Sequence, residues 1–226
     1  MLQRAVSLFK AQTYPNTELV IVYESDDPAT VNYAEGIDAP GIVGLEVPAA
    51  PDGTLGSLRN IAVKKCNGDY FCQWDDDDWY HPKRLELQMR VIKESRMPAS
   101  ILFHWLVFDS SLSRAYISCR RPWEGSLLCK KSIIDAYGIQ YENTAVSEDT
   151  AVIKNLFANH LVFPMMMPKL YIYVYHGRNV WHREHWQKIF SASSELSRPS
   201  GLLIEEILNG AYSPQEAATR LDAMEG

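Results

Sequence analysis

Strand-length apolar runs alternate with helix-like segments over residues 1–95, and this alternation constrains the fold more than any other feature. Residues 18–23 (ELVIVY) form a continuous apolar run, and residues 41–47 and 70–74 have similar length and character. Such runs are typical of strands that are covered on both faces. Helical spacing of apolar residues is found at 2–12 and 82–94. The alternation predicts an α/β fold with a mainly parallel sheet flanked by helices.

The second half of the chain has a different rhythm. Residues 101–109 and 114–119 predict an antiparallel pair of strands, and the chain after residue 181 is predicted to be helical to its end, with a break at 198–201. Further helices are expected near 132–137 and 148–158, and further strands around 161 and 170–175. We therefore expect a domain over 1–180 with a smaller antiparallel part, followed by a helical C-terminal extension over 181–226.

Composition and charge limit the binding partners and the cellular compartment that we expect for this chain. The net charge of -6 argues against a nucleic-acid partner, because phosphate backbones attract basic surfaces. We see no apolar run of transmembrane length, and the four cysteines form no C-x-x-C pair, so we expect a cytoplasmic protein with reduced thiols. The amphipathic C-terminal end lacks a basic face, which limits membrane contact to a peripheral one at the inner membrane. Packing back on the domain and homodimer formation both stay open for this segment.

Four consecutive aspartates, Asp75 to Asp78, follow directly after the predicted strand at 70–74. Carboxylates this close repel one another unless a cation is present, and Mg²⁺ and Mn²⁺ prefer oxygen ligands that they share with substrate phosphates. Alternate residues of an extended segment face the same side, so Asp75 and Asp77 are predicted to point at one ion. The alternative is a solvated acidic loop or a helix N-terminus, which applies to Asp78 above all.

Four blocks in order carry a resemblance to a known family. They read ELVIVYESDD (18–27), GSLRNIAVKKCNGDYFCQWDDDDWYHPKRL (56–85), WEGSLLCKKSIIDAYG (123–138) and SEDTAV (147–152). Over residues 1–180 the chain resembles the family 2 glycosyltransferases of the GT-A fold. The resemblance implies transfer of a sugar from a nucleotide-diphosphate donor, with a UDP-sugar favoured, to a hydroxyl of a saccharide or glycan acceptor. It also implies inversion at the sugar, dependence on Mg²⁺ or Mn²⁺, and a role in bacterial polysaccharide or glycan synthesis.

The resemblance assigns the donor side of the site. It implies that Asp77 contacts the metal, and that Asp75 serves both the metal and the ribose. Asp76 is expected on the donor side, and Glu24 stands where the family usually has an aspartate at the nucleoside base. In some relatives the element that His176 resembles touches the metal or the diphosphate.

The L-R-N element and the later blocks complete the predicted site. Arg59 and Asn60 are expected to approach the donor, where a guanidinium complements a diphosphate. Asp149 is expected to be the general base that deprotonates the acceptor hydroxyl. The acceptor side is assigned to Trp123, Glu124 and Glu148. The competing interpretation makes Ser147, Glu148 and Asp149 a helix cap and Trp123 a core residue.

One departure from the family bears on activity. Family members normally begin with a strand before the first helix, and here Met1 falls just inside that helix. We expect an N-terminally truncated domain with an open sheet edge, which impairs folding, recruits a partner strand or reduces activity. An inactive or truncated nucleotide-sugar-binding module is therefore the main alternative. A metal-dependent nucleotidyltransferase is disfavoured, because the chain lacks a glycine-rich phosphate loop near its start.

Overall fold

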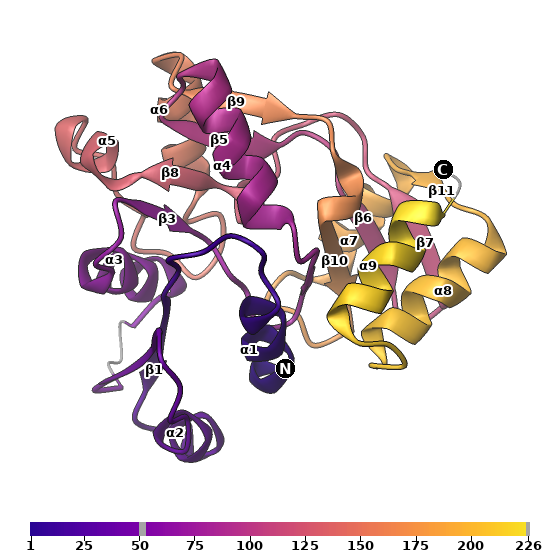
Figure 1. Ribbon diagram of the computed structural model, residues 1–226, viewed down its shortest axis with the longest axis horizontal. Coiled ribbons are helices and arrows are strands. Elements are labelled where there is room, and N and C mark those ends of the chain that lie inside the picture. Colours follow the sequence, from indigo (N-terminus) through magenta and orange to yellow (C-terminus); the bar gives the residue numbers. More distant parts are fainter. Residues whose placement is uncertain (50–52, 225–226) are drawn as a thin grey trace.

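The predicted alternation of helices and strands is present in the computed structural model, which describes residues 1–49 and 53–224 (Figure 1). The first half contains α1 (Leu2–Lys10), β1 (Leu19–Glu24), α2 (Pro28–Glu35), β2 (Ile42–Val47), α3 (Leu55–Lys65), β3 (Tyr70–Cys72), β4 (Trp79–Tyr80) and α4 (Arg84–Ser95). The second half contains β5 (Ala99–Leu102), β6 (Leu106–Asp109), β7 (Arg114–Ile117), β8 (Leu128–Lys130), α5 (Lys131–Ala136), α6 (Thr150–Ala158), β9 (Val162–Met165), β10 (Tyr171–Tyr175), α7 (Arg183–Ser191), β11 (Ser194–Glu195), α8 (Arg198–Leu208) and α9 (Pro214–Ala223).

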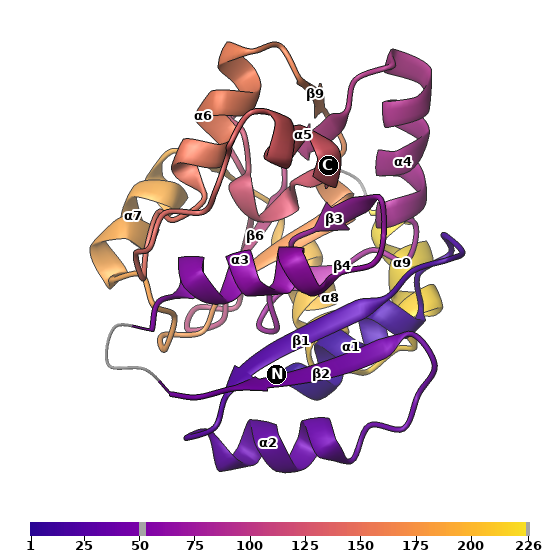
Figure 2. The same ribbon diagram turned by 90° about the vertical axis from the view of Figure 1, so that its left-hand side faces the viewer.

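The strands form three sheets. β1 and β2 are a parallel pair, β3-β8-β5-β9 is a four-stranded sheet, and β11-β7-β6-β10-β4 is a five-stranded sheet. Parallel pairing is found between β1 and β2, β5 and β9, and β6 and β10, and the other pairs are antiparallel. The α/β class is thus confirmed, with mixed sheets. In the described chain β1 and β3 do not pair with each other, and Figure 2 shows β1 and β2 side by side between α2 and α3.

Three sequence-based boundaries are wrong. The predicted strand at 101–109 is divided between β5 and β6, which belong to different sheets. The predicted break at 198–201 is instead the beginning of α8, because the Ser197 hydroxyl caps the Ser200 N–H and Pro199 is tolerated in a first helical turn. The segment after residue 181 is not helical throughout, because the short strand β11 pairs with β7 between α7 and α8. The last two residues of the predicted helical tail lie outside the described residues.

The C-terminal helices share a hydrophobic core with the start of the chain. Figure 1 shows α8 and α9 beside each other, packed on the five-stranded sheet. Ile204 of α8 and Leu221 of α9 are fully buried, and they belong to one cluster with Leu8 of α1 and Tyr80 of β4. A second cluster fills the space between the four-stranded sheet, α5 and α6. In the described part of the chain, every helix is too short or too polar to span a bilayer.

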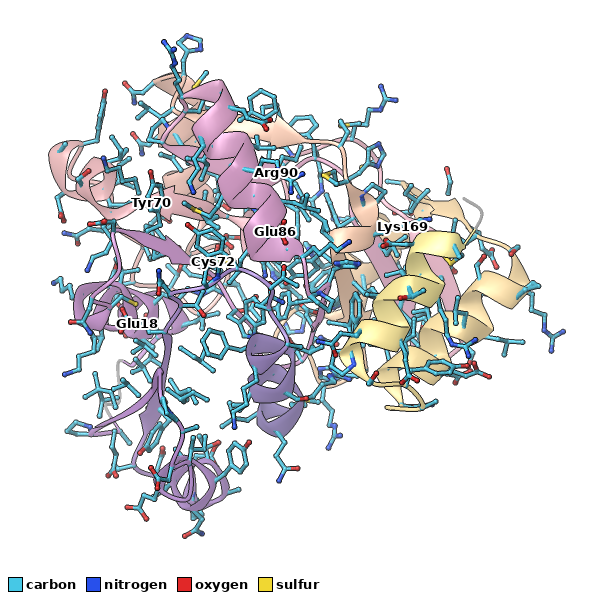
Figure 3. The ribbon with its side chains drawn as sticks, in the orientation of Figure 1. Glu18, Tyr70, Cys72, Glu86, Arg90 and Lys169 are labelled. Carbon is cyan, nitrogen blue, oxygen red and sulfur yellow. The ribbon has the colours of Figure 1, made fainter. Side chains whose placement is uncertain are left out.

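One side chain connects the two-stranded sheet to β3. Glu18, directly before β1, accepts hydrogen bonds from the Gly68 N–H (2.8 Å) and the Asn67 side-chain amide (3.0 Å) in the turn before β3. Figure 3 shows Glu18 near Tyr70 and Cys72 of β3. These hydrogen bonds hold the beginnings of β1 and β3 close together, and both strands line a large cavity.

Candidate active site

A large cavity in the described structure has a volume of about 1390 Å³. Its walls come from β1, α3, β3 and the aspartate run on one side, and from residues 123–125, 145–150 and 179–181 on the other. Typical small-molecule pockets occupy roughly 300–1,000 Å³, so the cavity has room for a nucleotide and a sugar together. Most of the site residues that the sequence predicts line it.

The aspartates of the run point to different partners. The Asp75 carboxylate accepts a hydrogen bond from Arg59 of α3 at 2.9 Å. Asp77 lies on the other side, with one carboxylate oxygen 3.2 Å from Nε2 of His176 and 3.2 Å from the side-chain amide of Asn179. Burial raises the pKa of Asp77, and the negative charge of Asp75 raises it further. A cation bound here would relieve that repulsion.

Asp78 is a buried anchor for the run. Its side chain is 0% exposed. Asp78 is therefore neither solvated nor at a helix N-terminus, which corrects the sequence-based alternative for this residue. Its carboxylate accepts hydrogen bonds from the Tyr171 hydroxyl and from the Val174 N–H at 2.9 Å, both in β10. Burial, and next the charge of Asp77, raise the pKa of Asp78 well above its ordinary value. Asp78 thus fixes the end of the run to the five-stranded sheet.

Arg59 contacts three carboxylates from two segments of the chain. Its guanidinium lies 2.9 Å from Asp75, 3.2 Å from Glu148 and 3.8 Å from Asp149. Burial opposes the charge of Arg59, but the three carboxylates outweigh it and raise the pKa of the guanidinium. One cation therefore holds the aspartate run close to the predicted catalytic base.

Asp149 directly precedes α6, yet its side chain makes no capping hydrogen bond to that helix. It faces the cavity and Arg59 instead. Burial raises the pKa of Asp149 to about 6, with a further contribution from the charge of Glu148 that Arg59 partly offsets. A carboxyl group with this pKa is ionised near neutral pH and is a stronger base than an exposed aspartate.

Comparisons with known proteins decide the family. The model of "Glycosyl transferase family 2" matches residues 1–134 of the 226. The chain belongs to this family. A Rickettsia felis "Uncharacterized glycosyltransferase" is 27% identical over 120 residues, which are 51% of this chain and 19% of that protein. A Rickettsia prowazekii "Uncharacterized glycosyltransferase" is 28% identical over 95 residues, which are 41% of this chain and 28% of that protein. The chain therefore spans about a fifth of the first relative's length and just over a quarter of the second's.

Solved structures show the fold. Residues 1–349 of S. aureus TarS in complex with UDP superpose with a TM-score of 0.63 at 14% identity, covering 96% of this chain and 64% of that one. The same TarS fragment with UDP-GlcNAc gives a TM-score of 0.63 at 13% identity, covering 92% of this chain and 66% of that one. The chain thus has the GT-A fold of TarS.

Two of the predicted site residues have mainly structural contacts in this chain. The Asn60 side chain donates to the Tyr141 carbonyl at 2.9 Å and accepts from the Tyr141 N–H at 3.1 Å, and it does not line the large cavity. Trp123 is 8% exposed and its ring stacks on Trp105 at 5.0 Å, although one edge lines the cavity.

Three other predicted residues lie at the cavity. Glu124 lines it and is paired with Arg121 at 3.5 Å, and burial raises the pKa of its carboxyl group. Glu24 lines the cavity at the end of β1. Asp76 is exposed at its rim.

Two residues of the site were not predicted from the sequence. Asn179 donates to Asp77, and it follows His176 by three residues, so the Y-H-G-R-N segment could have indicated it. Arg4 donates to the Asp77 carbonyl and to the Leu208 carbonyl at 3.4 Å. No local sequence signal points to Arg4, because its role depends on how α1 and α8 pack.

The residues present fit a divalent ion that is shared with a substrate. Among residues 1–49 and 53–224, no group of three or more His, Cys, Asp or Glu side chains converges as a complete metal site. Nε2 of His176 lies 3.2 Å from the Asp77 carboxylate, so one nitrogen and one oxygen donor lie beside each other. Mg²⁺ and Mn²⁺ commonly take one or two protein ligands and complete their shell with phosphate oxygens and water.

Proposed function

We propose that this family 2 glycosyltransferase is an inverting enzyme that transfers a sugar from a nucleotide-diphosphate donor to a hydroxyl of a saccharide or glycan. The observation that carries the proposal is the arrangement around Arg59, which places the Asp75–Asp77 segment and Asp149 at one cavity. A donor-binding motif and a base are the two groups that such a transfer needs. The setting we propose is polysaccharide or glycan synthesis.

The donor is proposed to be a UDP-sugar. Support comes from the shared fold of TarS, whose structures contain UDP and UDP-GlcNAc. In this chain Glu24 would face the base and Asp75 the ribose, because both line the cavity, Glu24 at the end of β1 and Asp75 shortly after β3. Arg59 would complement the diphosphate.

Asp77 and His176 would hold Mg²⁺ or Mn²⁺, with Asp75 nearby. When bound, a divalent ion neutralises the charge that develops on the leaving diphosphate. The raised pKa of Asp77 fits this role, since the carboxylates of the run are poorly compensated by the protein's own cations. The proposal of a bound metal ion therefore depends on the oxygen and nitrogen ligands that Asp77 and His176 would supply.

Asp149 is proposed to accept the proton of the acceptor hydroxyl. As the hydroxyl oxygen attacks the anomeric carbon, the bond from that carbon to the diphosphate oxygen breaks, and the nucleoside diphosphate leaves with the electron pair. Attack from the opposite face inverts the anomeric centre. Glu124 and Glu148 lie at the same part of the cavity, where they would orient the acceptor beside Trp123.

Release of UDP from UDP-GlcNAc in the presence of Mn²⁺ tests this proposal. We expect the wild type to release UDP, faster with a mixture of oligosaccharides than with water alone. Asp149→Asn should lower the rate at least a hundredfold, since general bases contribute roughly 10²–10⁴-fold. Glu142→Gln, which also removes one carboxylate but at an exposed position, should keep the rate. A wild type that binds UDP but releases none from UDP-GlcNAc would contradict the proposed transferase activity and favour a nucleotide-sugar-binding module.

A further inference from the structure

Tyr80 of β4 holds the backbone of Asp75. Its hydroxyl accepts a hydrogen bond from the Asp75 N–H at 2.6 Å and donates one to the Asp75 carbonyl at 2.9 Å. A single side chain thus satisfies both backbone polar groups of the residue that faces Arg59. Backbone polar groups away from water are costly to leave unpaired, so these two bonds restrict the conformation of Asp75 strongly.

The Tyr80 ring is itself fixed on several sides. The side chain is 0% exposed. Its ring centroid lies 4.0 Å from that of Trp74 and 5.0 Å from that of Tyr171, which meets it edge to face. The guanidinium carbon of Arg84, also 0% exposed, lies 4.7 Å above the ring. The hydroxyl can therefore not follow Asp75 if that residue moves.

Burial, together with the charges of Asp75 and Asp78, raises the pKa of Tyr80 well above its ordinary value. The hydroxyl stays protonated throughout the pH range in which an enzyme works. It can donate and accept at the same time under those conditions.

We propose that Tyr80 is a positioning residue, whose hydroxyl fixes the Asp75 backbone so that the Asp75 carboxylate stays on Arg59 at the cavity wall. The functional half of this inference rests on the proposed function, because it makes Tyr80 a determinant of nucleotide-diphosphate affinity. Tyr80 acts through Asp75 and does not itself touch the substrate. No motif indicates this role, since Tyr80 acts across a loop that closes only in the folded chain.

Amide hydrogen exchange tests the positioning directly and without any ligand. In Tyr80→Phe the ring stays and the two hydrogen bonds are lost, so exchange at the Asp75 amide should rise at least tenfold. Tyr116→Phe is the matched control, because Tyr116 is a buried tyrosine of the same sheet on β7, which β6 and β10 separate from β4. It should leave exchange at Asp75 within about twofold of the wild type. Unchanged exchange at Asp75 in Tyr80→Phe would overturn the proposal.

Calorimetric titration of UDP with Mn²⁺ tests the consequence for binding. We expect Tyr80→Phe to weaken UDP about tenfold, the effect of losing one or two hydrogen bonds to a buried group. In an Asp75→Ala background the same substitution should change the affinity less than twofold, because the carboxylate that Tyr80 positions is absent there. Equal losses in both backgrounds would show a general structural effect and contradict the positioning role. If the wild type does not bind UDP, the proposed function fails and the functional half of this inference falls with it, whereas exchange at Asp75 still decides the positioning half.

Discussion

Arg59 is the residue on which the electrostatics of the site depend. Its side chain is 15% exposed and serves Asp75, Glu148 and Asp149 at once. One positive charge does not balance three negative ones, so part of the repulsion remains and, after burial, contributes to the raised pKa of Asp149. The site is thus arranged to gain from an additional cation, at some cost to stability in its absence.

Replacing Arg59 should leave the repulsion among its three carboxylate partners uncompensated. We expect Arg59→Met to lower the free energy of unfolding by about 3–5 kcal/mol at pH 7.5, the typical cost of removing one partner from a buried ion pair. The loss should be smaller at pH 5, where Asp149 is mostly protonated. Urea unfolding at the two pH values measures this. The exposed Arg90, which pairs with Glu86 at 2.9 Å, provides the control Arg90→Met, expected to cost no more than about 1 kcal/mol. Equal losses for the two variants would contradict the central role of Arg59.

Asp149 should make stability and activity depend on pH in opposite ways. Its folded-state pKa of about 6 exceeds the ordinary value of 3.8, so the folded chain binds the proton more tightly and loses stability as pH rises from about 4 to 6. Asp149→Asn should therefore stabilise the protein more at pH 7.5 than at pH 4.5, by about 1–3 kcal/mol. Wild-type UDP release should fall below about pH 6, where the base becomes protonated. A stability difference independent of pH would show that Asp149 is not perturbed.

At the scale of elements, α3 and the loop before α6 fit each other closely. Gly56 in the first turn of α3 donates its N–H to the Thr144 carbonyl at 3.2 Å. A Cβ atom at position 56 would lie 1.8 Å from the Glu142 carbonyl oxygen. Since the same loop carries Glu148 and Asp149, the approach of α3 sets the distance between Arg59 and the base.

Gly56→Ala should therefore disturb both stability and the site. Because the clashing atom belongs to the backbone, the loop must move, and we expect a loss of about 1–3 kcal/mol in thermal or urea unfolding. UDP release should fall in parallel. Gly36→Ala at the end of α2 is the matched control, since its nearest neighbour would be an ordinary 3.4 Å away. A Gly56→Ala protein as stable as Gly36→Ala would contradict this packing.

The helices and strands show how much of the structure could be predicted from the sequence. Apolar runs predicted β1, β2 and β10, although burial along most of the strand is found only in β10 and β2 is partly exposed. The order of motifs indicated Asp75, Arg59 and Asp149 together. The division of 101–109 into two sheets could not be predicted, since only His104 interrupts the apolar run between β5 and β6. Arg4 was not predicted because its partners are determined by tertiary packing, and Tyr80 because its bonds to Asp75 depend on how the loop between them folds.

At the scale of the whole molecule, the C-terminal helices are packed into the main core. Ile204 and Ile207 of α8 and Leu221 of α9 are at most 3% exposed and contact the cluster that contains Leu8 and Tyr80. Two polar contacts reach the same region, since Arg4 bonds the Leu208 carbonyl and Asp222 lies 3.5 Å from His81. These helices thus support the segment that carries the aspartate run.

Ile204→Ala should weaken the whole molecule. Removing a fully buried isoleucine typically costs about 2–5 kcal/mol, and the loss should appear in a single cooperative unfolding transition because the core is shared. Leu202→Ala on the same helix, at a position 47% exposed, should cost less than about 1 kcal/mol. Two separate transitions, of which Ile204→Ala shifts one, would show that α8 and α9 fold independently.

Calorimetric titration of UDP, with Mn²⁺ and with EDTA, tests the central claim most directly. We expect UDP to bind with Mn²⁺ and not with EDTA, and Asp77→Asn to lower the affinity for UDP at least tenfold. Asp135→Asn, which removes the same charge from an exposed position on α5, should bind as the wild type does. No binding by the folded wild type, or equal binding by Asp77→Asn, would contradict a donor site built on Asp77, His176 and Arg59.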